Sequence, residues 1–127
     1  MSGINKIILV GHLGKDPDFR IVDNNIPIVS FPLATTETIN KNGVKIEQTE
    51  WHNIVMWRGL AEAARKILKK GKLVYVEGKC RTRSFEDKTG QKKHTTEVVV
   101  ESFTILGRNT DFEEDNLLRN TSEGYES

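Results

Sequence analysis

Both tryptophans of the chain lie in one short stretch, residues 49–57, whose residue types suit the binding of flat ring systems. Trp51 and Trp57 are six positions apart, so in a β-strand their side chains share one face. An α-helix would separate the two indoles by about 120°. The β-branched and aromatic residues around them favour the strand. The shared face indicates either a stacking platform for aromatic ligands or a part of the hydrophobic core.

The opposite face of this strand bears on that choice. It carries Ile54 and Met56, which can supply the core, and His52 lies beside them. The face with the two indoles is therefore available as an aromatic platform, and burial of both tryptophans remains the alternative.

A second stretch, residues 79–85, combines charge with an aromatic ring. Its alternate residues share a strand face and are Lys79, Arg81, Arg83 and Phe85. Proteins that bind single-stranded nucleic acid place cations along the phosphates and stack rings on unpaired bases. The stacking candidates are Trp51, Trp57 and Phe85. The phosphate candidates are Arg81, Arg83, Lys69, Lys70, Lys72, Lys88, Lys92 and Lys93, although any one of these lysines, taken alone, is better interpreted as solvated surface.

The charge of the 127-residue chain is unevenly distributed. Residues 1–106 carry 17 basic and 12 acidic side chains, a net charge of +5, and residues 107–127 carry −4. A basic body predicts a polyanionic partner, with ordinary solubilising charge as the alternative. Residues 107–127 show no sustained periodicity, so we expect one folded domain, 1–106, followed by a disordered acidic tail that adds nothing to nucleic-acid affinity.

The number of cysteines and the length of the apolar runs indicate the cellular compartment. Cys80 is the only cysteine, so no intrachain disulfide is possible. The longest early apolar run, residues 7–10, is too short for a signal peptide or a membrane span. We therefore expect a soluble, cytoplasmic protein with no membrane partner.

Five β-strands and one helix are expected to position these residues. The strands are predicted at residues 4–13, 27–36, 47–57, 72–85 and 94–106, with a further short strand at 19–22. The near-continuous apolar residues of 4–13 predict burial on both faces. Hairpin turns are expected at Asn42-Gly43 and around Thr89-Gly90, a bend or bulge near Gly78, and an edge or bulge at Pro32.

The helix is predicted at residues 58–70, where apolar residues recur every three or four positions. Lys69 and Lys70 suit the negative end of its dipole, and Gly71 suits its C-cap. Five strands with one helix between the third and fourth follow the order of the OB-fold, an all-β Greek-key barrel that binds oligonucleotides.

The chain resembles the bacterial single-stranded DNA-binding protein family over residues 3–106. The matching blocks are residues 5–11 (NKIILVG), 33–37 (LATTE), 49–52 (TEWH), 60–62 (LAE), 68–71 (LKKG), 74–78 (VYVEG), 81–83 (RTR) and 95–100 (TTEVVV). The resemblance implies a cofactor-free homotetramer that binds single-stranded DNA without sequence specificity during replication, recombination and repair, and that associates with the nucleoid. It also implies base stacking by Trp51, Trp57 and Phe85, and a position for His52 near a subunit interface.

The sequence departs from the family pattern at several positions. Ile39 stands where a further tryptophan is frequent, Asn53 where an arginine is common, and Arg58-Gly59 where a glycine–lysine pair is usual. The chain ends in residues 123–127 (EGYES) rather than in the family's acidic tip with a terminal phenylalanine, which leaves open the protein partners that bind the tail.

Assembly has its own sequence hints. Leu73, Tyr75 and Glu77 share the face opposite Val74 and Val76, so apolar surface would be exposed in a monomer. The predicted interface residues are His52, Leu73, Tyr75 and Glu77. The alternative for His52 is a hydrogen bond inside its own subunit.

Two other functions compete with DNA protection. OB-folds also occur in nucleases, but His12, His52 and His94 lie on different elements without ligand spacing, so an enzyme is not expected. A subunit of a replication complex that keeps the fold and binds DNA weakly is the second alternative.

Overall fold

Six β-strands and one α-helix form the structure, a computed structural model that describes residues 2–107. The elements are β1 (Ile7–Leu13), β2 (Asp18–Val22), β3 (Ile26–Lys41), β4 (Val44–Trp57), α1 (Gly59–Ile67), β5 (Leu73–Glu86) and β6 (Lys92–Ile105), with a 3-10 turn, η1 (Asp23–Asn25), between β2 and β3. Apart from Gly107, the predicted tail of residues 107–127 lies outside the described residues.

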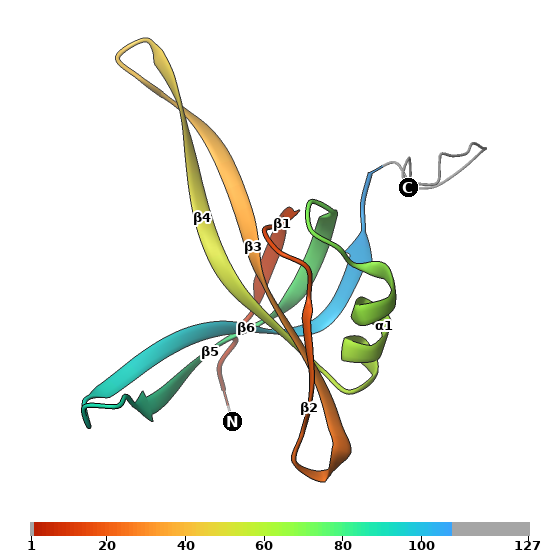
Figure 1. Cartoon of the computed structure of the whole chain (residues 1–127). Helices are drawn as coiled ribbons and strands as arrows, with labels where there is room; N and C mark the ends of the chain where they lie inside the picture. Colours follow the sequence, from red (N-terminus) through yellow and green to blue (C-terminus); the bar gives the residue numbers. More distant parts are fainter. Residues whose placement is uncertain (1, 108–127) are drawn as a thin grey trace, which may run out of the picture.

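Strand pairing closes five of the strands into a barrel (Figure 1). β1 pairs with β5 on one side and with β3 on the other, and β4 joins β6 in the one parallel pairing of the described residues. The remaining neighbours, β3–β4 and β5–β6, are antiparallel hairpins. β2 adds to β3 beside the barrel. The predicted five-stranded OB-fold with one helix is confirmed.

Two long hairpins, β3–β4 and β5–β6, extend from the barrel away from α1 (Figure 1). The first turns at Asn42 and Gly43, whose φ angles of 53° and 80° match the positive values that a two-residue hairpin turn requires. Pairing continues up to the turn, with Lys41 opposite Val44. β3 and β4 are therefore longer than predicted, because cross-strand pairing extends through a polar stretch that shows no apolar pattern.

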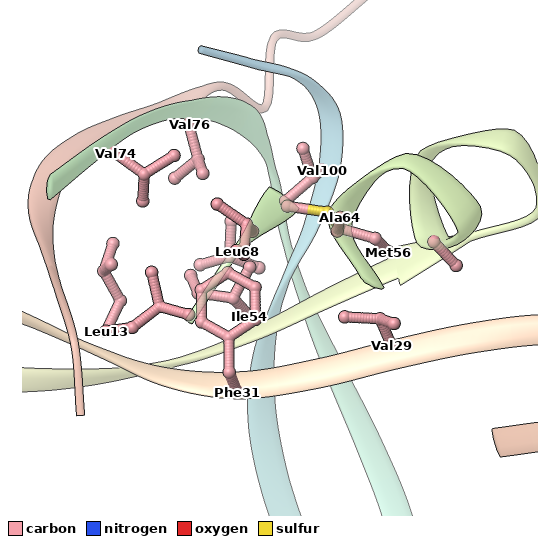
Figure 2. Close-up of a cluster of buried hydrophobic side chains, with 13 residues drawn as sticks. Leu13, Val29, Phe31, Ile54, Met56, Ala64, Leu68, Val74, Val76 and Val100 are labelled. Carbon is pink, nitrogen blue, oxygen red and sulfur yellow. The ribbon is translucent and has the colours of Figure 1, made fainter. Parts of the chain in front are cut away.

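The core fills the barrel and the space under α1 (Figure 2). Leu33, Ile54 and Met56 are fully buried, so the predicted core face of β4 is confirmed. Each large apolar side chain buried in this way contributes on the order of 1.5–3 kcal/mol. α1 adds Ala61 and Ala64, whose small side chains let the helix lie close against the sheet.

The helix ends earlier than predicted. Leu68 leaves helical geometry at φ −93° and ψ 146°, and only its N–H continues the pattern by donating to Ala64 O. This extended backbone places the Leu68 side chain in the core, where it is 5% exposed. Lys69 and Lys70 therefore follow the helix instead of forming its last turn, and the C-cap prediction for Gly71 is wrong.

The first strand is buried on one face only, contrary to prediction. Ile8 is 54% exposed and Val10 is 47% exposed. They lie on the outer surface of β1, opposite Glu77 and Tyr75 of β5, respectively. A continuous apolar run thus supplies the core with one face and leaves an apolar strip on the outside.

Local irregularities in the sheet follow the sequence. The register of β5 and β6 shifts at Glu77/Gly78, as predicted, and a Cβ at Gly78 would overlap the Val99 carbonyl oxygen. Pro32 is neither at an edge nor at a bulge. Its carbonyl accepts the Gly14 N–H at 2.9 Å. The nitrogen of Pro32 points to the same side, between the part of β3 that pairs with β2 and the part that pairs with β1. Proline's lack of an N–H therefore removes no hydrogen bond between paired strands.

Among residues 2–107 no helix has the length and apolar character needed to cross a membrane.

Candidate nucleic-acid interface

Two indole rings are exposed on the outer face of β4. Trp51 is 61% exposed and Trp57 is 41% exposed, while Ile54 and Met56 on the opposite face are buried. Alternation along the strand thus separates platform from core as expected, and the alternative that both tryptophans belong to the core is wrong. Covering such a ring with the ring of a ligand removes apolar area from water and adds a stacking contact.

The Trp51 ring lies over the loop that follows β1. A Cβ built on Gly14 would overlap Cζ3 of this ring and come within 2.8 Å of Cη2. The Gly14 N–H donates to Pro32 O at 2.9 Å, which fixes the loop beneath the ring. Sequence reasoning missed this role of Gly14, because the contact joins two segments far apart in the chain.

The parallel pairing of β4 with β6 brings the second predicted group onto the same face. Val55 of β4 is in register with Val99 of β6, which in turn lies opposite Lys79 of β5. Alternation from Lys79 then places Arg81, Arg83 and Phe85 on this face. Phe85, 48% exposed, stands farther out on the β5–β6 hairpin. Rings and cations therefore share one continuous surface, which we call the indole face.

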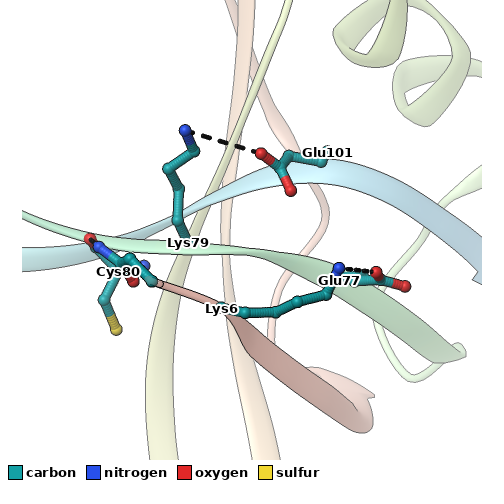
Figure 3. Close-up of polar contacts among 6 residues, drawn as sticks. Lys6, Glu77, Lys79, Cys80 and Glu101 are labelled. Atoms are coloured by element: carbon teal, nitrogen blue, oxygen red, sulfur yellow. Dashed lines mark hydrogen bonds and ion pairs between the residues drawn. The ribbon is translucent and has the colours of Figure 1, made fainter. Parts of the chain in front are cut away.

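Carboxylates of β6 hold two of these cations. Arg83 Nη2 lies 3.0 Å from Glu97 Oε2, and Lys79 Nζ lies 3.7 Å from Glu101 Oε2 (Figure 3). Both cations remain about half exposed or more, so a phosphate can reach them. Glu97 and Glu101 were not among the predicted site residues. The alternation within β5 does not reveal which charged residues of β6 lie beside it.

The lysines of the β5–β6 tip are divided between the two faces. Lys93 lies opposite Phe85, on the indole face, whereas Lys92 lies opposite Glu86 and projects from the other face. Lys88 sits in the turn itself. Lys93 Nζ is 3.8 Å from Asp87 Oδ2.

Asp87 organises this turn. Its Oδ1 accepts the Thr89 hydroxyl at 2.7 Å, the Thr89 N–H at 2.9 Å and the Gln91 N–H at 3.0 Å. The hydrogen bond from the Thr89 hydroxyl, followed by that from the Gln91 amide, lowers the pKa of Asp87 below its ordinary value. Two backbone bonds also close the turn, from the Asp87 N–H to Gln91 O at 2.9 Å and from the Gly90 N–H to Asp87 O at 3.0 Å, so the carboxylate and the backbone together hold the tip that carries the predicted lysines.

The remaining predicted lysines form a separate group between α1 and β5. The Lys70 N–H donates to Asp16 Oδ1 at 2.9 Å, and the Gly71 N–H donates to Leu13 O at 2.8 Å. These bonds place Lys69, Lys70 and Lys72 beside the β1–β2 loop. The structure therefore does not bring them together with Arg81 and Arg83.

Arg20 of β2 was missed by sequence reasoning. It lies opposite Ile28 of β3, which lies opposite Trp57, so the three side chains form a row across the indole face. Its Nη2 is 3.0 Å from Asp18 Oδ2, and its side chain is 71% exposed. Ile39 lies opposite Ile46, and alternation puts both on the face of the β3–β4 hairpin away from Trp51.

A hollow lies on the indole face, in the section of β4 between the two tryptophans. Its volume is about 350 Å³, and Asn53 and Val55 of β4 line it. The rest of the lining comes from the β1–β2 loop, from β2, β3 and β6, and from a further residue of β4: Lys15, Asp16, Asp18, Ser30, Phe31, Pro32, Ile54 and Glu97.

The predicted interface residues of β5 lie on its outer face where it pairs with β1, and Glu77 stands two positions from Lys79 on that face. Leu73, Tyr75 and Glu77 are partly exposed, and Val74 and Val76 behind them are buried, as the alternation predicted. The Tyr75 hydroxyl donates to Glu77 Oε1 at 2.9 Å, and Lys6 pairs with Glu77 Oε2 (Figure 3). The hydrogen bonds from Lys6 and Tyr75 lower the pKa of Glu77.

His52 has a partner within its own chain. Its Nε2 lies 2.9 Å from Thr35 Oγ1 in a half-buried position. This is the hydrogen bond that the alternative reading of His52 expected, and the ring does face away from the indoles.

A closed five-stranded barrel that presents aromatic rings and cations on one sheet face is the OB-fold type of oligonucleotide-binding domain. The family comparison is more specific: the chain belongs to the single-strand binding protein family, whose model matches residues 4–106.

Named relatives agree with this membership. The single-stranded DNA-binding protein 1 of Xylella fastidiosa is 43% identical over 113 residues, covering 87% of this chain and 83% of that protein. The single-stranded DNA-binding protein of Neisseria meningitidis is 45% identical over 105 residues, 82% of this chain and 60% of that protein. A chain in the Plasmodium falciparum SSB complex with ssDNA superimposes with a TM-score of 0.78 at 31% identity, covering 84% of this chain and 98% of that one.

Proposed function

We propose that this protein binds single-stranded DNA on the indole face, without a fixed sequence, and so protects exposed strands during replication, recombination and repair in the cytoplasm. Bases stack on Trp51, Trp57 and Phe85, while cations such as Arg81 and Arg83 contact phosphates. The observation that carries the proposal is the exposure of both tryptophans, 61% and 41%, on the same face as the arginines. A duplex hides the ring faces of its bases, so such a surface suits single strands.

Family membership and chemistry both favour binding over catalysis. The names of the family and of the relatives describe binding alone. The indole face offers stacking rings and phosphate-binding cations, which hold a strand without breaking a bond. The weakly binding adaptor differs from this proposal only in affinity, so a titration separates the two.

The central test is a fluorescence titration with poly-dT. We expect strong quenching of tryptophan emission, and Trp51→Ala should cost on the order of 1–3 kcal/mol of binding if one base loses its platform. Affinity should also fall with salt, with a log–log slope of about −0.7 per phosphate neutralised. Unchanged affinity in a folded Trp51→Ala protein would refute stacking, and weak binding by the unmodified chain would favour the adaptor.

We further propose that the protein acts as a homotetramer. The apolar strip of Ile8 and Val10 lies beside Tyr75 on the outer face of β1 and β5, and this exposed surface supports association with a second copy. Homotetramers usually have dihedral symmetry with self-complementary interfaces. The bond between His52 and Thr35 satisfies one nitrogen of its ring, so the role of His52 in assembly rests on the family resemblance. Protein partners of the tail are left open.

A further inference from the structure

The outer part of the β3–β4 hairpin, residues 37–48, is a two-stranded ribbon whose tip projects clear of every other labelled element (Figure 1). It contains three large apolar residues, Ile39, Val44 and Ile46. Ile39 lies opposite Ile46, and Val44 lies opposite Lys41, so alternation puts all three on one side of the ribbon. We call this side the apolar face of the ribbon.

The apolar face is turned away from the indoles. The pairs that alternation places on the same side as Trp51 are polar or charged, Thr38 with Glu47 and Asn40 with Lys45. A strand of DNA on the indole face therefore leaves the apolar face of the ribbon available for a different contact.

In a single copy, much of this apolar face is in contact with water. Val44 is 59% exposed and Ile46 is 38% exposed. Single exposed apolar residues are normal on a protein surface, but here they gather on one side of an otherwise polar ribbon. A two-stranded ribbon is only marginally stable by itself, and covering these side chains removes apolar area from water. The apolar face is therefore suited to docking.

The charges at the two ends of the apolar face favour a second copy of the same ribbon as the partner. Lys41 lies two residues from Ile39 toward the tip, and Glu37 lies two residues from Ile39 toward the barrel. Both side chains are on the apolar face and exposed, and within residues 2–107 neither forms an ion pair. A surface with a cation at one end, an anion at the other and an apolar centre is complementary to itself after half a turn.

We propose that two copies pack the apolar faces of their ribbons together, with the ribbons antiparallel, about a two-fold axis that crosses each ribbon at the Ile39–Ile46 pair. Each isoleucine then meets its own counterpart. Lys41 of each copy meets Glu37 of the other, because both lie about 6.6 Å from the axis along the strand. Packed sheets lie about 10 Å apart, a space that branched apolar side chains fill.

So few residues make a contact smaller than a standard stable interface, which covers about 800 Å² per partner. The ribbon contact therefore adds to assemblies that other surfaces form, and it involves neither DNA nor the indoles. It goes beyond the proposed function and does not depend on it.

The test reverses the two charges in the full chain. Lys41→Glu or Glu37→Lys alone places like charges opposite each other at both symmetric positions, whereas the double variant restores opposite charges. Sedimentation velocity without DNA, at low salt, gives the protein concentration at which the average mass rises above its low-concentration value. We expect each single reversal to raise that concentration about threefold to tenfold, and the double variant to return it close to that of the unmodified protein.

A mixture of the two single variants provides a second measurement. The mixture should associate at a lower concentration than either variant alone, because the two acidic side chains of one variant then face the two basic side chains of the other. Ile46→Thr keeps a β-branched residue and removes apolar area, so it should weaken association without a change of charge.

Glu47→Lys is the matched control. Glu47 lies opposite Thr38 on the side of Trp51, so this variant makes the same change of charge as Glu37→Lys, on the same ribbon but away from the apolar face. It should leave self-association unchanged.

Several results would overturn the ribbon contact. These are an average mass that does not rise with concentration, single reversals that have no effect or that the double variant does not restore, and an equal effect of Glu47→Lys. If Ile46→Thr changes only the affinity for poly-dT, the apolar face contacts DNA and not a second copy. Because the association is measured without DNA, its failure leaves the proposed function intact.

Discussion

Trp51 depends on a glycine in a distant loop for its position. Its ring lies against Gly14, and the Gly14 N–H is bonded to Pro32 O on the strand beside Trp51. Exposed aromatic side chains otherwise choose freely among rotamers, and ordering one on binding costs free energy. A loop that supports the ring in advance reduces that cost, so the platform is a property of three segments rather than of one residue.

The substitution Gly14→Ala tests this support. The added methyl group overlaps the Trp51 ring, so the indole must move, whereas the backbone of Gly14 does not need a positive φ. We expect a folded protein of nearly unchanged stability whose affinity for poly-dT falls by about 1 kcal/mol, with less quenching of tryptophan emission. Gly59→Ala, at a glycine with open space around it and no positive φ, controls for the glycine-to-alanine change itself. Full affinity in the Gly14 variant would count against the platform.

Arg58 is strained at the start of the helix. Its φ of 59° and ψ of −125° fall where glycine is strongly preferred. Its N–H donates to Pro27 O at 2.8 Å and its carbonyl accepts the Glu62 N–H at 3.1 Å, so the surroundings enforce this conformation. Such strain costs of order 1–3 kcal/mol. The family resemblance places a glycine here, and the arginine therefore departs from it at a cost in stability.

Arg58→Gly should accordingly stabilise the protein by about 1 kcal/mol, after the greater entropy of glycine in the unfolded chain is subtracted. Urea unfolding monitored by circular dichroism measures the change. Arg58→Ala is the control, because it removes the side chain but keeps the Cβ that causes the strain. Equal stabilisation by both variants would show that the side chain, not the backbone, is responsible.

At the scale of elements, the β5–β6 hairpin extends the indole face beyond the barrel. It carries Phe85 and Lys93 on that face, and its turn is closed by three hydrogen bonds to Asp87 Oδ1. A two-stranded ribbon without a core of its own depends on its turn for register. Order at the tip therefore governs where Phe85 and Lys93 are presented for the proposed contact with a strand.

The substitution Asp87→Ala should loosen the tip. We expect faster hydrogen exchange at the Thr89 and Gln91 amides and a modest loss of affinity for single strands, with the barrel unaffected. Thr89→Val, which removes only the hydroxyl bond, should show a smaller effect. Unchanged exchange at both amides in Asp87→Ala would contradict the role of the carboxylate.

The pKa of Asp87 predicts how this turn responds to acid. Because the hydrogen bonds lower that pKa, the charged form is favoured in the folded turn, and its contribution is present above the ordinary aspartate pKa. The contribution is lost as pH falls through the lowered value. Amide protection at Thr89 and Gln91 should thus persist at pH values where a free aspartate, with a pKa of about 3.9, is already protonated. Loss of protection above that pH would refute the shift.

At the scale of the whole molecule, the two tryptophans lie on β4 and the apolar strip lies on β1, and these two strands do not pair with each other, so we expect that a strand and a second copy can bind together. Val10→Glu places a charge in the apolar strip opposite Tyr75 and should dissociate the tetramer. Ile21→Glu, at a similarly exposed apolar residue on β2, should leave assembly intact. Sedimentation equilibrium distinguishes the 14.4 kDa chain from larger species. A monomer before any substitution would refute the tetramer.

Tetramer formation should also change the affinity for single-stranded DNA. If four copies share one strand, Val10→Glu should weaken binding chiefly at low protein concentration, because linked sites raise the effective concentration of each other. Affinity that does not depend on protein concentration in either protein would argue that each barrel binds alone.

Local sequence determined the elements and the faces of the strands. Alternation put Trp51 and Trp57 opposite Ile54 and Met56, and it put Arg81, Arg83 and Phe85 on one side of β5, because a strand's period is a property of its own residues. Asn42-Gly43 and Gly78 marked a turn and a bulge through backbone preferences that are equally local.

Tertiary structure alone decided which faces meet. The parallel pairing of β4 with β6 set Glu97 beside Asn53, and the pairing of β2 with β3 set Asp18 and Arg20 near the same hollow. The alternation of residues within one strand does not predict either register. Each register results from packing strands that are distant in the chain around one common core. The same packing drew Leu68 out of the helix and left Lys69 and Lys70 beside Asp16. The sequence therefore determined which residues are available for contact with a strand of DNA, and the closed barrel decided which of them lie on one face.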